Sequence, residues 1–319
     1  MKKLFILTAA ALAFVACSND TDKATTVQNT DGAIRLTTGM LTRGTNQDIQ
    51  STQMANGQSA WVVFTASVTP DNDLTTTSEA GKWTAADKTA SAAYTADGAG
   101  TLSTTTVTKW PKGTAATETV SIKAFAPFTA PPSGDQTVAA NQTTDANYLA
   151  SDYLFGQAAS FGNSAIQNPI LVTFDHMLAK VIVNVTAADA SVSVSGAKVV
   201  FGDPSSNNVE LAYSINTTSG AIGTPSATSM SSIVMADAVA ADGKCAAIVV
   251  PQTIANAQKL FTITLGTATY TYTLPAAKTF TGGNVYTYNI SLRTDGTVII
   301  LNETINQWTS DTTEGVIAG

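Results

Sequence analysis

The sequence predicts an all-β protein built of antiparallel β-sandwiches. Apolar residues recur mostly with a period of two, and candidate strands follow one another at short intervals marked by Gly, Pro, Asn and Asp. Thr, Ala, Ser and Gly dominate the composition, and helical heptads are absent. Strands in this pattern are typical of sandwich domains. With 319 residues, the chain is long enough for two such domains, each with its own core.

The N-terminus has the features of a secretory signal peptide, assigned to residues 1–16. Lys2 and Lys3 precede an apolar run from Leu4 to Ala16, which is too short to span a bilayer. The run ends at Cys17 and turns polar, and this pattern resembles a bacterial lipobox, in which the cysteine is acylated. We therefore expect lipidation of Cys17; the alternative is ordinary signal cleavage near Ala16.

A polar tether and a strand-like segment follow the signal peptide. Residues 18–32 are polar and are expected to be flexible, whereas residues 33–42 have strand character. Arg43 and Gly44 come directly after this segment and before another polar stretch. The bond between them is therefore expected to be exposed.

The remaining strand candidates alternate between apolar and polar or small residues. They are residues 61–68, 104–110, 120–126, 171–186, 191–201, 208–215, 245–250, 259–265, 267–274, 285–292 and 297–305. Residues 128–149 contain Pro-Pro, Gly, Asn and Asp and are expected to form a long loop. A short helical piece is expected near residues 234–241.

Charge and residue counts exclude several functions. Lys and Arg number 16 against 23 Asp and Glu, a net charge of −7 without a basic block, which argues against nucleic-acid partners. One His and two Cys are too few for a Cys/His zinc cage. A Ser-His-Asp or Cys-His enzyme would need His176, and a lone histidine at a strand start is more often a packing or hydrogen-bonding residue. We expect no enzyme activity, metal or cofactor.

Several segments, in order along the chain, resemble the fimbrillin family, the type V pilins of Bacteroidales. They are Trp110-Pro111 with residues 120–127, residues 151–155, residues 174–181 (FDHMLAKV), residues 283–292 and the closing residues 305–308 (INQW). The resemblance implies two transthyretin-like β-sandwich domains in tandem, placed at residues 44–168 and 169–319. It assigns structural roles to the family-motif residues Trp110, Phe174, His176, Tyr286, Tyr288 and Trp308.

The resemblance also implies a maturation step. In the family a protease removes the first strand after a basic residue, so residues 17–43 would form a lipidated, removable propeptide. An arginine-specific protease would cut after Arg43, leaving Gly44 as the new N-terminus, with Arg35 as the alternative site.

A strand from another subunit would then fill the vacated groove. Residues 296–319 are the donor candidate, with Val298, Ile300, Val316 and Ile317 as the apolar side chains that the groove would accept. The alternative is that residues 298–305 are the last core strand of the second domain.

The functional hypothesis is therefore a stalk or tip subunit of a surface fimbrium, serving adhesion and biofilm formation. Its partners would be copies of itself or other fimbrial subunits, the protease, the outer membrane through Cys17, and host or bacterial surface ligands. The rival hypothesis is a monomeric surface lipoprotein that binds glycans.

Overall fold

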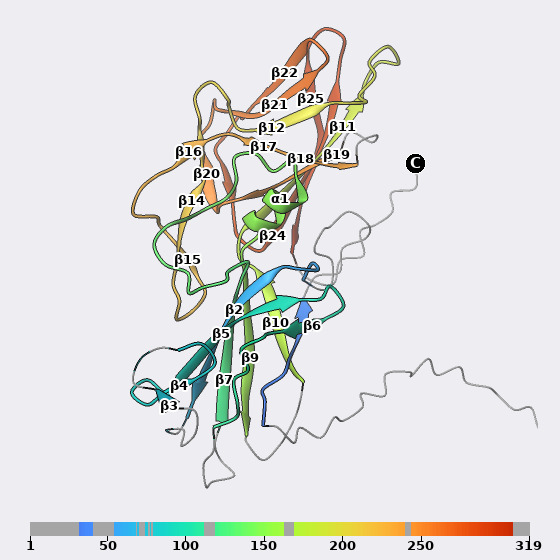
Figure 1. The fold of residues 1–319 in the computed structure, drawn as a ribbon. Coiled ribbons are helices and arrows are strands. Elements are labelled where there is room, and N and C mark those ends of the chain that lie inside the picture. Colours follow the sequence, from blue (N-terminus) through green and yellow to red (C-terminus); the bar gives the residue numbers. More distant parts are fainter. Residues whose placement is uncertain are drawn as a thin grey trace, which may run out of the picture.

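The computed structural model describes residues 32–40, 54–67, 69, 74–75, 77, 79–111, 119–162, 169–239 and 244–308. This part of the chain is almost entirely β-structure with one short helix, so the all-β prediction is confirmed. Figure 1 shows two lobes, one formed by the first part of the chain and the other by the second. Among the described residues, no helix is both long and apolar enough to cross a bilayer.

The strands of the first lobe close into a barrel in the order β1-β10-β9-β7-β2-β5-β6. They are β1 (Leu36–Met40), β2 (Ser59–Ala66), β5 (Thr89–Ala96), β6 (Thr101–Ser103), β7 (Thr119–Ala126), β9 (Leu154–Gly162) and β10 (Ile170–His176). A small parallel pair, β3 (Leu74–Thr75) and β4 (Trp83–Thr84), lies beside it. Two separate sheets were expected here, and the difference arises because β1 pairs with both β6 and β10.

Strict alternation explains why these segments form a barrel with a filled interior. On β2, Val62 and Phe64 are fully buried, while Trp61 and Val63, which alternate with them, are only partly buried. Tyr94 on the neighbouring β5 packs against Phe64, with ring centroids 6.3 Å apart. Successive side chains of a strand point to opposite faces, so such a pattern places one face in the core.

The second lobe is a sandwich of two facing sheets, as predicted, but the expected antiparallel pairing fails at one place, where residues 180–187 and 285–292 pair in parallel. One sheet has the order β18-β19-β11-β24-β25 and the other β17-β12-β21-β22. Their strands are β11 (Ala179–Ala187), β12 (Lys198–Phe201), β17 (Ile233–Val234), β18 (Ala236–Val239), β19 (Lys244–Val249), β21 (Lys259–Leu265), β22 (Ala268–Thr273), β24 (Asn284–Leu292) and β25 (Val298–Gln307). Short strands complete the lobe: β8 (Gln136–Thr137), β13 (Val209–Glu210), β14 (Ala212–Ile215), β15 (Ile222–Gly223), β16 (Met230–Ser231), β20 (Gln252–Ile254) and β23 (Lys278–Phe280).

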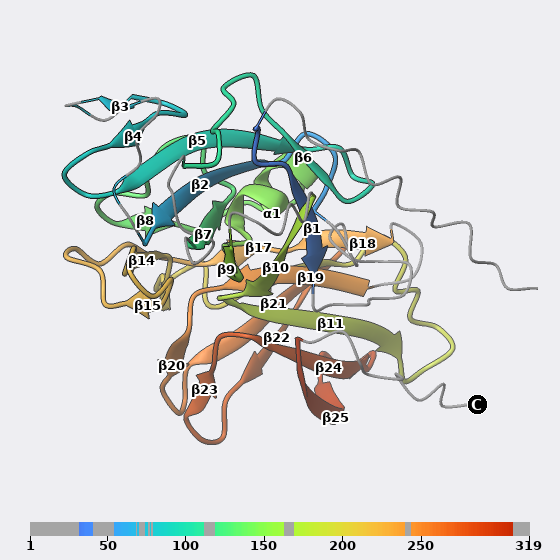
Figure 2. The ribbon, with the colours of Figure 1, turned by 90° about the horizontal axis from the view of Figure 1, so that it is seen from below.

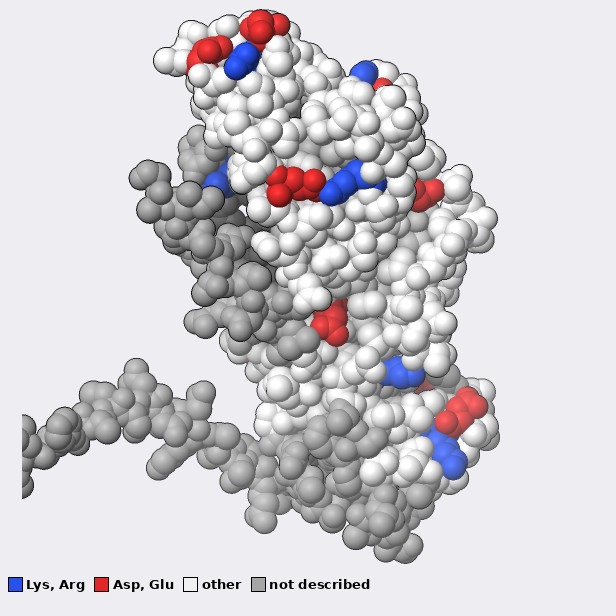
Figure 3. All heavy atoms as spheres, turned by 180° about the vertical axis from the view of Figure 1, so that it is seen from behind, with Lys and Arg blue, Asp and Glu red and all other residues white. Residues whose placement is uncertain are grey.

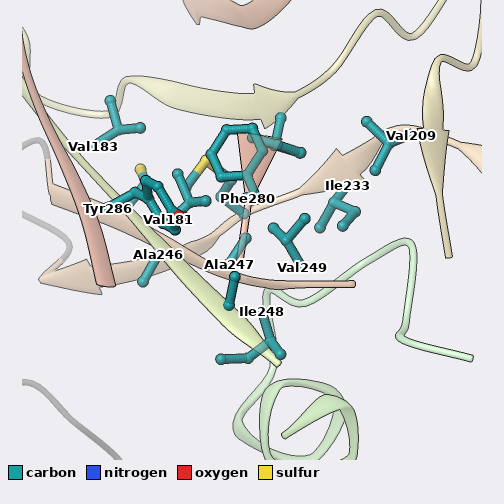
Figure 4. Packing of buried hydrophobic residues seen from close by; sticks show 14 of the residues in the cluster. Val181, Val183, Val209, Ile233, Ala246, Ala247, Ile248, Val249, Phe280 and Tyr286 are labelled. Carbon is teal, nitrogen blue, oxygen red and sulfur yellow. The ribbon is translucent and has the colours of Figure 1, made fainter. Parts of the chain in front are cut away.

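The sandwich core is aliphatic with an aromatic centre. Figure 4 shows Val181, Val249, Phe280 and Tyr286 converging from different strands. The rings of Phe280 and Tyr286 lie 4.9 Å apart, and Phe201 packs edge-on against Phe280. The transthyretin-like topology of the domains stays a prediction.

The segment between β7 and β9 belongs to the second lobe's surface rather than forming the free loop that its composition predicts. It contains β8, which pairs with β14, and the helix α1 (Asp145–Ser151), capped by the Thr144 side chain. Gln142 before the helix is fully buried, and its amide both donates to and accepts from the backbone of Ile248 at 2.8 Å. The side chain thus continues the pairing of β19 beyond Ala246, the residue opposite the start of β18.

Other expected boundaries also differ from the structure. The expected domain boundary near residue 168 would assign β10 to the second lobe, but β10 pairs with β9 and β1 in the barrel, so the change to the sandwich follows His176. Residues 104–110 are irregular apart from one bridge between Ala33 and Lys109. Residues 236–239, expected as helix, form β18 because they pair with β19.

Candidate functional site

The first candidate site is the seat of β1 in the barrel. β1 pairs in parallel with β10 from Leu36 opposite Ile170 to Met40 opposite Phe174, and antiparallel with β6 through Leu36 and Thr37. It therefore closes the barrel alone, between two strands that do not pair with each other. Figure 2 shows β1 beside β10 and β6.

Alternation along residues 33–38 places an apolar stripe in this seat. Ile34 is 3% exposed and Leu36 is 1% exposed, and Leu36 lies opposite the buried Ile170 and Leu102. Arg35 between them is exposed, and its carbonyl accepts a hydrogen bond from the Ile170 amide at 2.8 Å. Without β1, β6 and β10 would each present unpaired backbone groups beside an apolar recess.

The family-motif residue Trp110 lies at the entrance to this seat. Its side chain is buried, and its amide donates to the Gly32 carbonyl just before β1. Phe174 on β10 is fully buried in the same core, over Gly156 of β9. A Cβ at position 156 would meet the Phe174 ring at 2.8 Å, so the close packing requires glycine.

The second candidate site lies where the two lobes meet and is built around His176. Its Nδ1 atom lies 2.8 Å from Oδ1 of Asp152, which follows α1, and both side chains are at most 1% exposed. The indole of Trp308, at the end of β25, stacks on the imidazole with ring centroids 3.6 Å apart. The Lys180 ammonium lies 5.5 Å from the centre of the same indole.

The surroundings of Asp152 are aromatic and buried. Burial raises the pKa of Tyr148 and of Tyr213, and the negative charge of Asp152 adds to both rises. Neither Nε2 of His176 nor Nε1 of Trp308 has a hydrogen-bond partner within the described part of the chain. The indole covers the imidazole, so the Asp–His pair has no access to a substrate and holds strand ends together instead.

The remaining family-motif residues belong to the sandwich core. The Tyr286 hydroxyl accepts a hydrogen bond from the Thr281 amide at 2.7 Å, and Tyr288 packs edge-on against Phe261. Val298 and Ile300, the described donor candidates, lie on β25 and pack against the core of their own lobe. Further along β25, Leu301 and Ile305 are exposed.

Other predicted site residues lie outside the described residues. These are Cys17, Arg43, Gly44, Val316 and Ile317. Among the residues that are described, no cluster of His, Cys, Asp and Glu could hold a metal ion. On the face seen in Figure 3, charged side chains are few and of both signs, without a basic stripe.

Sequence reasoning did not find the contacts of His176. It named His176 and Trp308 separately but not their stacking, and it missed Asp152 and Lys180 as their partners. Asp152 lies 24 residues before His176, so only the pairing of the strands brings them together. The motif around residues 151–155 was the one available signal.

The fold and these two sites define a class: a two-lobed, all-β structural protein whose buried polar groups hold strands in place. A family model described as fimbrillin-like matches residues 42–308, so the chain belongs to the fimbrillin-like family. The chain is accordingly a structural protein and not an enzyme. The comparison with curated proteins found no match.

Two solved structures share the fold over nearly their whole length. A candidate cell adhesion protein from Bacteroides ovatus has 19% sequence identity and a TM-score of 0.63, with 88% of this chain and 99% of that chain covered. A candidate cell adhesion protein from Bacteroides uniformis has 18% identity and a TM-score of 0.60, with 88% of this chain and 100% of that chain covered.

Proposed function

We propose that this chain is the precursor of a fimbrial subunit, in which β1 occupies the place that a strand of another subunit takes after proteolysis. The observation that carries the proposal is the seat of β1: the first described strand closes the barrel between β6 and β10. Membership of the fimbrillin-like family supports it. The fimbrium would serve adhesion and biofilm formation.

The energetics of the seat favour refilling over an empty groove. Each buried aliphatic side chain, such as Ile34 or Leu36, contributes about 1.5–3 kcal/mol of gross stabilisation when it leaves water. An empty groove would also leave the backbone N–H and C=O groups of β6 and β10 that face β1 without partners, which costs further free energy. Ordering a free strand offsets part of this gain, but an opened barrel remains a strong acceptor for a strand from another subunit.

The position of the cut follows from backbone pairing. Arg35 lies in the paired segment, where its carbonyl is bonded to the Ile170 amide, and a protease needs locally unfolded chain. Arg43 follows β1 and precedes a polar stretch. Cleavage there would leave Gly44 as the N-terminus and release residues 17–43 with the lipid on Cys17, which anchors the precursor to the outer membrane.

The donor strand would come from residues 296–319 of a neighbouring subunit. Val298 and Ile300 are partly buried in their own lobe, and this supports the alternative that β25 is a core strand. Under that alternative Val316 and Ile317, beyond the described residues, supply the apolar side chains. Either source makes other fimbrial subunits the partners of this chain.

Treatment of purified precursor with an arginine-specific protease tests the proposal. We expect loss of residues up to Arg43, followed by oligomers that resist SDS. Arg43→Ala should block both events, whereas Arg35→Ala, the matched control, should leave both unchanged. A trimmed but monomeric product would contradict the proposal and favour the glycan-binding lipoprotein.

A further inference from the structure

The resident strand β1 carries one side chain that does not suit its seat. Thr38 lies opposite the fully buried Val172 and is itself 6% exposed. Its amide is used, because it donates to the Gly100 carbonyl at 2.7 Å. Its hydroxyl oxygen, however, is buried, and none of the described residues forms a hydrogen bond with it.

The neighbouring threonine on this strand differs, because its hydroxyl has a backbone acceptor within reach. Thr37 points to the other face, is only partly buried, and donates to the Ile170 carbonyl at 3.5 Å. The inward positions before Thr38 are Ile34 and Leu36, both aliphatic and buried. The seat is thus apolar at three successive inward positions, and the resident strand fills only two of them with apolar side chains.

We propose that the position of Thr38 determines which strand the seat prefers, and that it selects a strand of another subunit with a β-branched aliphatic residue there. The inference rests on the proposed function and adds the chemistry of the partner. A buried hydroxyl without a partner costs free energy, and Val has nearly the same shape without that cost. β1 is therefore a weaker occupant than its best competitor.

The partner strand is defined by this pattern. It carries aliphatic residues at the places of Ile34, Leu36 and Thr38 and polar residues between them, where the strand faces outward. A second copy of this chain offers Val298 and Ile300 for the places of Leu36 and Thr38 but Gly296 for that of Ile34, so it matches this pattern at two of the three positions. A free strand with this pattern should displace β1 once the covalent link of β1 is cut.

The first test measures competition for the seat in full-length protein cut after Arg43. Fluorescent peptides of residues 32–42 are added with the native sequence, with Thr38→Val or with Thr37→Val. We expect the Thr38→Val peptide to dissociate about tenfold more slowly than the native peptide. The Thr37→Val peptide, which gains the same β-branched methyl on the outer face, should show no comparable gain.

The outcomes separate the two proposals. Equal or faster dissociation of the Thr38→Val peptide overturns the inference and leaves the proposed function standing. If no peptide enters the cut protein, the native one included, both proposals fail. A second measurement needs no cleavage: Thr38→Val in the intact precursor should raise its unfolding midpoint above that of Thr37→Val, and a lowered midpoint would show that the hydroxyl is needed where it lies.

Discussion

Three side chains from distant parts of the sequence meet at the lobe junction: Asp152, His176 and Trp308. The carboxylate fixes the imidazole, and the indole lies flat on it at 3.6 Å between ring centroids. Trp308 thereby ties the end of β25 to the end of β10, that is, the sandwich edge to the barrel. Trp308, which the sequence marks only as the end of a motif, thus connects the two lobes.

Replacing Trp308 by Ala should remove this contact between the lobes. We expect a loss of about 3–5 kcal/mol in the free energy of unfolding, measured with urea, because a large buried aromatic side chain is lost. Ile305→Ala, on β25 just before Trp308 but exposed, is the matched control and should change stability by about 0.5 kcal/mol or less. Equal effects of the two substitutions would show that the stacking contributes nothing.

Asp135 gives the protein a pH dependence with a definite sign. Its carboxylate accepts hydrogen bonds from the Ser226 hydroxyl and the Ser226 and Ala227 amides, which hold its pKa below the usual 3.8. A carboxyl whose pKa is lower in the folded than in the unfolded state stabilises the fold above the unfolded value. That contribution is lost as the pH falls through the folded value.

Asp135→Asn should therefore lower the unfolding midpoint at about pH 7, and the deficit relative to the native protein should shrink below about pH 4. Thermal unfolding of both proteins across this pH range measures the difference between their midpoints. Asp87→Asn, at an exposed position on the other lobe, is the control and should show no such convergence. A deficit that stays constant with pH would refute the role of the charge.

At the scale of single elements, alternation made most strands predictable. Residues 61–68, 120–126 and 285–292 correspond to β2, β7 and β24, since each has a buried face set by its own sequence. Residues 236–239, expected as helix from their local sequence, form β18 because strand pairing outweighs local preference. Helix α1 was missed because it has only seven residues and depends on the surface it covers.

The candidate sites were predictable only in part, because they depend on pairing between distant segments. Strand character in residues 33–42 was visible, but not that β1 closes a barrel by joining β6 to β10. Likewise, the polar composition of residues 128–149 concealed the fully buried Gln142. Composition reports average exposure, whereas the bond to Ile248 depends on one side chain.

Gln142→Ala should leave both backbone groups of Ile248 without their partner. Each buried group left unpaired costs about 1–3 kcal/mol, and the Ile248 amide should exchange its hydrogen faster. Native-state hydrogen exchange measures the local effect and urea unfolding the global one. Gln157→Ala, at an exposed position of β9, should change neither; unchanged exchange at Ile248 in the Gln142 variant would contradict the assignment.

At the scale of the whole molecule, the lobes share packing and should unfold together. The core of the second lobe includes Phe125 and Phe155 from barrel strands. The Tyr153 hydroxyl donates to the carbonyl of Gly220, which lies in the second lobe, at 2.9 Å. Gly220 lies against the Phe155 ring, where a Cβ would come within 2.2 Å of it.

We expect a single calorimetric transition for the native protein. Gly220→Ala should push the lobes apart and lower the midpoint temperature of that transition. Gly196→Ala is the matched control, because its φ of +77° is close to the +74° of Gly220 but a Cβ there meets nothing within 4 Å. Both variants carry about 1–2 kcal/mol of backbone strain, and Gly220→Ala should lose about 1–3 kcal/mol more. Two separate transitions in the native protein would show that the lobes are independent.

The closed barrel has a consequence for the life of the chain before it meets any partner. A sheet that returns on itself offers no margin to which a foreign strand can adhere. As long as β1 remains in place between β6 and β10, crowding newly made copies together cannot link their barrels edge to edge. The closure of the barrel thus depends on the covalent continuity of one short segment.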